Sequence, residues 1–127
     1  MNQRILVVDD EGDILDLARI VLESGGYDVA TAASGEEALR IISMKKPDLV
    51  LLDVVLPGVS GLDVCRLLKR DPGTRPIKVV LFTALGTEVD MMLEKKDQAD
   101  GYLAKPFTSK MLLDLVGRLL NDPRGGS

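Results

Sequence analysis

Carboxylates, a hydroxyl and an ammonium follow short apolar runs at four places in the sequence. They are Asp9 with Asp10, Asp53, Thr83 and Lys105. The runs are rich in Val, Ile and Leu, which is typical of strands buried on both faces of a parallel sheet. In such a sheet, ligands bind outside the carboxyl ends of the strands. We therefore expect these side chains to converge in one crevice.

The three carboxylates determine the chemistry of this crevice. Neighbouring carboxylates repel one another, which raises some of their pKa values unless a cation lies between them. Oxygen ligands alone, few of them from protein, are what Mg²⁺ prefers. A carboxylate beside such a cation can attack phosphorus and form an aspartyl phosphate. The Thr83 hydroxyl and the Lys105 ammonium would then neutralise the phosphoryl oxygens.

Each residue also has an ordinary explanation when taken alone. An Asp after a strand is often a helix cap, a Thr there is often a strand former, and a lone Lys is usually a surface charge. Residues 105–107 could form only a turn. The joint placement at strand ends favours function. Residues 54–58 have the composition of an exposed loop, in which Gly58, followed by Gly61, permits sharp turns.

Composition excludes several classes of function. The 127 residues correspond to one domain, and the net charge of −4 gives no reason to bind nucleic acid directly. The absence of histidine excludes His-based catalysis and a phosphohistidine carrier. No apolar run approaches the about 20 residues of a membrane helix, and no signal peptide is visible. The single Cys65 is expected to pack as a small hydrophobe in a cytoplasmic protein.

Basic residues occur in pairs near the ends of predicted helices. The pairs are Lys45-Lys46, Lys69-Arg70 and Lys95-Lys96. Each is expected to be a solvated helix end that complements the helix dipole.

Helical patterns separate the apolar runs. The first helix is predicted from a stripe at helical spacing, which comprises Ile14, Leu17, Ala18, Val21 and Leu22. Ser34, Ser60 and Thr108 are the expected N-caps of three more helices. Residues 88–96 indicate a weaker helix, and residues 27–33 a less apolar strand. Five strand–helix units in succession predict an α/β sheet with helices on both faces.

The sequence resembles response-regulator receiver domains from about residue 4 to residue 120. The resemblance is carried by VVDDE at 7–11, LLDV at 51–54, LPG at 56–58, FTA at 82–84 and GYLAKPF at 101–107. It implies a flavodoxin-like (βα)₅ fold, a doubly wound five-stranded parallel sheet with strand order 2-1-3-4-5. It also implies a receiver domain over residues 1–122, with residues 123–127 as a flexible tail or the start of a linker.

The resemblance assigns Asp53 as the phosphoacceptor, which takes its phosphoryl group from a histidine kinase, a phosphotransfer protein or a small phosphodonor. Asp9 and Asp10 are implied to hold Mg²⁺ together with Asp53 and the backbone carbonyl of Val55. Lys105 is implied to bind the phosphoryl group. The family also has a cis peptide before the proline that corresponds to Pro106.

The resemblance further implies a switch. Thr83 corresponds to the switch hydroxyl, and Tyr102 to the aromatic side chain whose rotamer couples to the active state. Val55 and Leu85 occupy variable positions that affect the lifetime of the phosphoryl group. Many members have an acidic residue where this chain has Ser60, which lies outside the reaction centre. The implied output is a changed surface that controls a protein target or a fused effector domain, with a phosphorylation-dependent dimer as an option.

Two other functions compete with this interpretation. An aspartate-nucleophile phosphohydrolase usually has a second acid two residues after the nucleophile, where this chain has Val55. We therefore expect no enzyme beyond Mg²⁺-dependent self-phosphorylation and autodephosphorylation. A phosphate-independent scaffold typically lacks one of the acidic residues, the Thr or the Lys, and here all are present.

Overall fold

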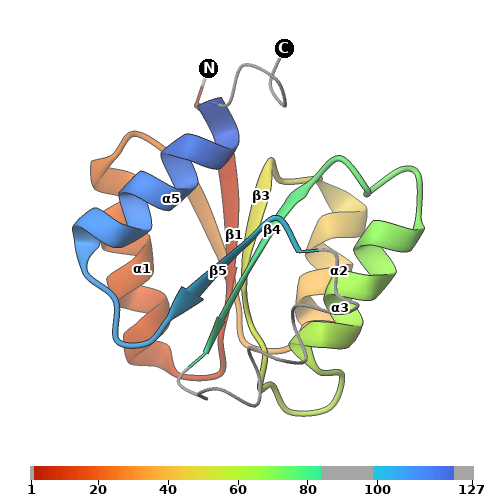
Figure 1. The fold of residues 1–127 in the computed structure, drawn as a ribbon. Helices are drawn as coiled ribbons and strands as arrows, with labels where there is room; N and C mark the ends of the chain where they lie inside the picture. Colours follow the sequence, from red (N-terminus) through yellow and green to blue (C-terminus); the bar gives the residue numbers. More distant parts are fainter. Residues whose placement is uncertain (1, 84–98, 122–127) are drawn as a thin grey trace.

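The computed structural model of the protein describes residues 2–83 and 99–121 (Figure 1). Five strands form one sheet: β1 (Arg4–Val8), β2 (Asp28–Ala32), β3 (Leu49–Asp53), β4 (Lys78–Thr83) and β5 (Gly101–Ala104). The described helices are α1 (Gly12–Ser24), α2 (Gly35–Met44), α3 (Gly61–Arg70) and α5 (Ser109–Asn121). All strand pairs are parallel and the order is β2-β1-β3-β4-β5, as predicted. The helix expected over residues 88–96 lies outside the described residues.

Helices cover both faces of the sheet, with α1 and α5 on one side and α2 and α3 on the other (Figure 1). Successive strand side chains point to opposite faces. In β1, Ile5 and Val7 therefore pack in the cluster with α1 and α5, whereas Leu6 and Val8 pack in the cluster with α2 and α3. All five residues of β3 are buried, which explains why its sequence is apolar up to its last position, Asp53. None of the described helices is both long and apolar enough to cross a bilayer.

The three predicted N-caps are confirmed. Ser34 Oγ accepts from the Glu37 N–H, Ser60 Oγ accepts from the Asp63 N–H, and Thr108 Oγ1 accepts from the Met111 N–H, each at 3.1 Å. Each bond satisfies one of the backbone donors that a helix start leaves without an intrahelical partner. These caps fix where α2, α3 and α5 begin relative to the strands that precede them.

One apolar position of the predicted stripe on the first helix is more exposed than expected. Leu17 in α1 is 46% exposed, and Leu67 in α3 is 43% exposed. Cys65, by contrast, is fully buried among the apolar residues between the sheet and α3, as expected.

Lys69 is not the solvated helix end that the sequence predicted. Its ammonium is almost fully buried and donates to the carbonyl oxygens of Arg75 (3.0 Å) and Ile77 (2.7 Å). It also lies 2.7 Å from Asp100 Oδ2, which accepts a hydrogen bond from the Val79 N–H (2.8 Å). The carbonyls and carboxylate replace water around the ammonium. Lys69 thereby joins the end of α3, the start of β4 and the start of β5.

Removing this ammonium should destabilise the domain strongly. Lys69→Met keeps the aliphatic stem but leaves Asp100 and two carbonyls without their donor. We expect the free energy of unfolding to fall by about 3 kcal/mol, the range for breaking a buried ion pair. The matched control is Lys110→Met, which breaks the exposed pair with Asp114 and should leave denaturant unfolding unchanged. Equal effects of the two substitutions would contradict a structural role for Lys69.

Candidate functional site

The predicted site residues lie at the carboxyl edge of the sheet. Asp9 follows β1, Asp53 is the last residue of β3, and Lys105 follows β5. Parallel pairing places Val8 beside Leu52 in neighbouring strands, so Asp9 and Asp53 leave the sheet at the same level. The convergence expected from the strand ends is therefore present for two carboxylates and the ammonium.

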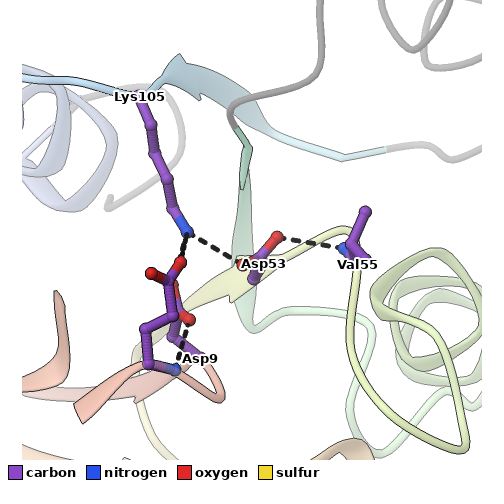
Figure 2. Close-up of polar contacts among 5 residues, drawn as sticks. Asp9, Asp53, Val55 and Lys105 are labelled. Carbon is purple, nitrogen blue, oxygen red and sulfur yellow. Dashed lines mark hydrogen bonds and ion pairs between the residues drawn. The ribbon is translucent and has the colours of Figure 1, made fainter. Parts of the chain in front are cut away.

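Lys105 holds the centre of this site. Its Nζ lies 2.7 Å from Asp9 Oδ2 and 2.9 Å from Asp53 Oδ2 (Figure 2). Glu11 Oε1 lies further away, at 3.5 Å. The ammonium also lies 4.8 Å from the centre of the Phe82 ring, close enough for a cation–π interaction. The ammonium thus lies over an aromatic ring of β4 and bonds to carboxylates at the ends of β1 and β3.

Each aspartate is fixed through both of its oxygens. Asp9 Oδ1 accepts from the Glu11 N–H at 2.9 Å, and Asp53 Oδ1 accepts from the Val55 N–H at 3.0 Å. The other oxygen of each carboxylate is bonded to Lys105. Because Asp9 is fully buried and Asp53 is 5% exposed, these four contacts replace most of their hydration.

Burial and charge shift the pKa values of both partners. Burial raises the pKa of Asp53, and the Asp9 charge adds to the rise, against the opposing hydrogen bonds from Lys105 and Val55. Burial acts to lower the pKa of Lys105, but the hydrogen bonds with Asp9 and Asp53 outweigh it and raise that pKa. Lys105 is therefore a cation at neutral pH, whereas the ionised form of Asp53 is disfavoured by its surroundings.

The acidic residues around Lys105 form a group that could hold a metal ion. Asp9, Asp10, Glu11 and Asp53 each offer one carboxylate oxygen, and these oxygens all lie within 4.8 Å of one another. An oxygen-only donor set with an exposed side at Asp10 and Glu11 suits a hard cation that keeps several waters. Glu11 was not among the predicted ligands. The sequence pointed to Glu11 only through its position directly after Asp9 and Asp10. Whether its side chain reaches the site depends on the turn after β1.

A glycine brings α3 against β3, the strand that ends in Asp53. Gly61, the first residue of α3, donates its N–H to the Val54 carbonyl at 3.0 Å. A Cβ on Gly61 would collide with the Asp53 carbonyl oxygen, so any other residue would push α3 away from β3. Gly58 has a φ of 71°, a conformation that favours glycine. Both predicted turn glycines are therefore required by the backbone.

The structure describes only some of the remaining predicted residues. Val55 is 53% exposed beside the site, and Tyr102 on β5 is 45% exposed. Thr83 ends β4 and pairs in register with Ala104, but its side chain lies outside what the structure describes, as does all of Leu85. The Lys105-Pro106 peptide bond is cis, as the resemblance implied.

The fold and the acidic site together define an α/β module with a cluster of charged side chains at the carboxyl edge of its parallel sheet. A family model described as "Response regulator receiver domain" matches residues 5–117. The chain therefore belongs to the response-regulator receiver domain family, whose members are phosphorylation-activated modules of two-component signalling.

Individual relatives agree with this assignment. The DNA-binding response regulator MtrA of Mycobacterium tuberculosis is 44% identical over 116 residues, which cover 91% of this chain and 50% of that protein. The chain thus spans half the length of this curated relative. A receiver domain of a histidine kinase from Syntrophus aciditrophicus superposes with a TM-score of 0.89 at 34% identity and covers 96% of this chain and 92% of that chain. A CheY-like receiver from Methanospirillum hungatei gives a TM-score of 0.90 at 28% identity, with 100% of both chains covered.

Substituting Asp53 should stabilise the metal-free protein in a pH-dependent way. Because its pKa is raised in the folded state, the native protein favours the neutral carboxyl group, and ionisation of Asp53 lowers the free energy of unfolding. Asp53→Asn removes this ionisation. At pH 7, in chelator, we expect the Tm of Asp53→Asn to lie above that of wild type.

The difference in Tm between Asp53→Asn and wild type should decline as the pH falls through the folded-state pKa of Asp53. It should vanish below the pKa of Asp in the unfolded chain, about 3.9. Thermal unfolding at several pH values measures it. Asp16→Asn, at an exposed position of α1, is the control. A constant difference between Asp53→Asn and wild type at every pH would contradict the role of ionisation.

Proposed function

We propose that this chain accepts a phosphoryl group on Asp53 from a histidine kinase, a phosphotransfer protein or a small phosphodonor such as acetyl phosphate. One observation carries the proposal. Asp53 is a buried carboxylate whose ionised form is disfavoured, yet it lies in direct contact with a cation at a strand end. A purely structural carboxylate in this position would not be surrounded by further acidic groups.

The residues of the site have distinct roles in the transfer. An Asp53 oxygen attacks phosphorus while the bond to the donor breaks, either the P–N bond of a phosphohistidine or the P–O bond of an acyl phosphate. The donor leaves with the bonding electron pair. The Val55 N–H, 3.0 Å from Asp53 Oδ1, orients the carboxylate. Lys105 is already bonded to Asp53, and its ammonium would donate to the phosphoryl oxygens as negative charge accumulates on them.

The acidic group is the proposed Mg²⁺ site. Asp9, Asp10 and Asp53 would hold the ion together with the Val55 backbone carbonyl, and Glu11 lies close enough to add an oxygen or bind a coordinated water. Bound Mg²⁺ supplies positive charge that offsets both the carboxylates and the phosphoryl oxygens. Lys105 and Mg²⁺ thus complement each other, because a single ammonium does not balance this set of carboxylates.

Phosphorylation is proposed to act as a switch. It adds about −1.5 to −2 charges and three acceptor oxygens, which would recruit the Thr83 hydroxyl and Lys105. Thr83 is the last residue of β4, and Tyr102 is the second residue of the neighbouring strand β5. This recruitment would bias the position of Tyr102 and the surface around it. That surface would control a protein target or an effector domain, and a phosphorylation-dependent dimer is one form of this output.

The module itself is proposed to span residues 1–122, with residues 123–127 as a tail or the start of a linker. MtrA, described as DNA-binding, is twice as long as the segment it shares with this chain. Nucleic-acid binding would therefore belong to a further domain, whereas this acidic domain carries no charge pattern for it. The proposed location is the cytoplasm, where histidine kinases donate their phosphoryl groups.

Phosphorylation should occur at Asp53 and require a divalent cation. Incubation with acetyl phosphate and Mg²⁺ should add one phosphoryl group, detected by the mass of the intact protein. Asp53→Ala should remain unlabelled, and Asp63→Ala, at an exposed position of α3, should label like wild type. Undiminished labelling of Asp53→Ala, or of wild type in excess chelator, would disprove the assignment.

The aspartyl phosphate should be long-lived. Hydrolysis needs a water aligned opposite Asp53, and a polar side chain near that path can orient it. Val55 and Leu85, which the family places there, have no hydrogen-bonding side chain. We expect Val55→Asn with Leu85→Glu to hydrolyse about 10-fold faster than wild type or more. The measurement is the decay of phosphorylated protein after the donor is removed, at fixed Mg²⁺ and pH. Equal decay rates would show that other features control the lifetime.

A further inference from the structure

A cavity of about 610 Å³ lies between α2, α3 and the loop over residues 71–74. It opens near the C-terminal ends of both helices, whereas Asp53 lies at the carboxyl edge of the sheet, beside the N-terminal end of α3. Its volume falls in the range of small-molecule sites, about 300–1,000 Å³. The proposed phosphoryl chemistry does not use this cavity.

The walls of the cavity are apolar. Leu39 and Ile42 come from α2, and Leu67 and Leu68 come from α3. Leu67 is 43% exposed. An apolar side chain of this kind over a cavity provides surface that a ligand could cover.

The mouth of the cavity carries more positive than negative charge. Lys46 and Arg70 contribute the cations, and Asp71 contributes the carboxylate. Asp71 Oδ1 is bonded to the Gly73 N–H (2.9 Å). Lys46 Nζ donates to the Gly73 carbonyl (2.8 Å), which uses one of its three donors and ties the end of α2 to the loop. The volume of about 610 Å³ suits a compact ligand rather than a long helix.

Arg70 is not needed to cap α3. The last four carbonyls of the helix, at residues 67–70, all accept hydrogen bonds from the segment that follows. The donors are Asp71 N (3.4 Å), Thr74 Oγ1 (2.7 Å), and Arg75 Nε and Nη2 (3.0 and 3.3 Å). Within residues 2–83 and 99–121, the exposed Arg70 guanidinium makes no hydrogen bond or ion pair. It is a cation at the mouth of an apolar cavity with its five donors available.

We propose that this cavity binds a small amphipathic anion, a compact aromatic or aliphatic body with one carboxylate. The apolar body would lie between Leu39, Ile42 and Leu67. The carboxylate would pair with Arg70, whose planar guanidinium suits a bidentate contact, and with the remaining donors of Lys46. A neutral ligand of the same shape would gain only the apolar contacts, so affinity should depend on the charge of the ligand and of Arg70 together.

The test uses 2-naphthoate and its neutral analogue 2-naphthamide, titrated into the ¹⁵N-labelled full chain and followed by amide chemical shifts. We expect 2-naphthoate to bind with a Kd below about 1 mM, a realistic affinity for a ligand of this size. The shifts should map to residues 39–46 and 67–74. The amide should bind about 5-fold more weakly.

Arg70→Gln should weaken 2-naphthoate about 5-fold and leave 2-naphthamide unchanged, whereas Leu67→Glu should weaken both. Arg118→Gln, on α5 at the opposite face of the sheet, is the matched control and should alter neither. Shifts confined to other regions, equal binding of the two compounds, or equal effects of Arg70→Gln and Arg118→Gln would overturn the proposal. A concentration-dependent dimer that Leu67→Glu disrupts would also overturn it, because a second copy would then occupy the cavity.

Discussion

The contact of the Lys105 ammonium with Asp9 and Asp53 is the interaction on which the functional end of this fold depends. It links the ends of β1, β3 and β5, and the Phe82 ring of the intervening β4 fills the space beneath it. Without the ammonium, two buried carboxylates would face each other with only one backbone N–H each. The strand order therefore determines the site, because only β1 and β3 as neighbours place both aspartates within reach of one lysine.

This arrangement leaves the site with more negative charge than one ammonium can balance. The excess favours a divalent cation, and under the proposed function that cation would also offset the charge of a phosphoryl group on Asp53. In the metal-free protein, burial raises the pKa of Asp53, and the Asp9 charge adds to the rise. Stability and reactivity are thus opposed at this residue, as is common where a buried ionisable group has a function.

The sequence predicted those features that are local or that the sheet geometry makes unavoidable. The strand order followed from the family resemblance, the three N-caps followed from Ser34, Ser60 and Thr108, and the convergence of Asp9, Asp53 and Lys105 followed from their places at strand ends. Lys69 could not be predicted, because its partners lie at residues 75, 77 and 100 and meet it only after folding.

Lys69 and Lys105 differ in what surrounds them. The surroundings of Lys69 indicate a structural role, whereas those of Lys105 indicate a functional one. Lys69 faces two carbonyls and one carboxylate, which balance its charge, and it fixes the far end of α3 and the start of β5. The near end of α3 is fixed where Gly61 meets the backbone of β3. Because α3 is held at both ends, phosphorylation of Asp53 is not expected to displace it as a body. Under the proposed switch, movement would instead involve Thr83 at the end of β4, Tyr102 within β5 and Lys105 directly after β5.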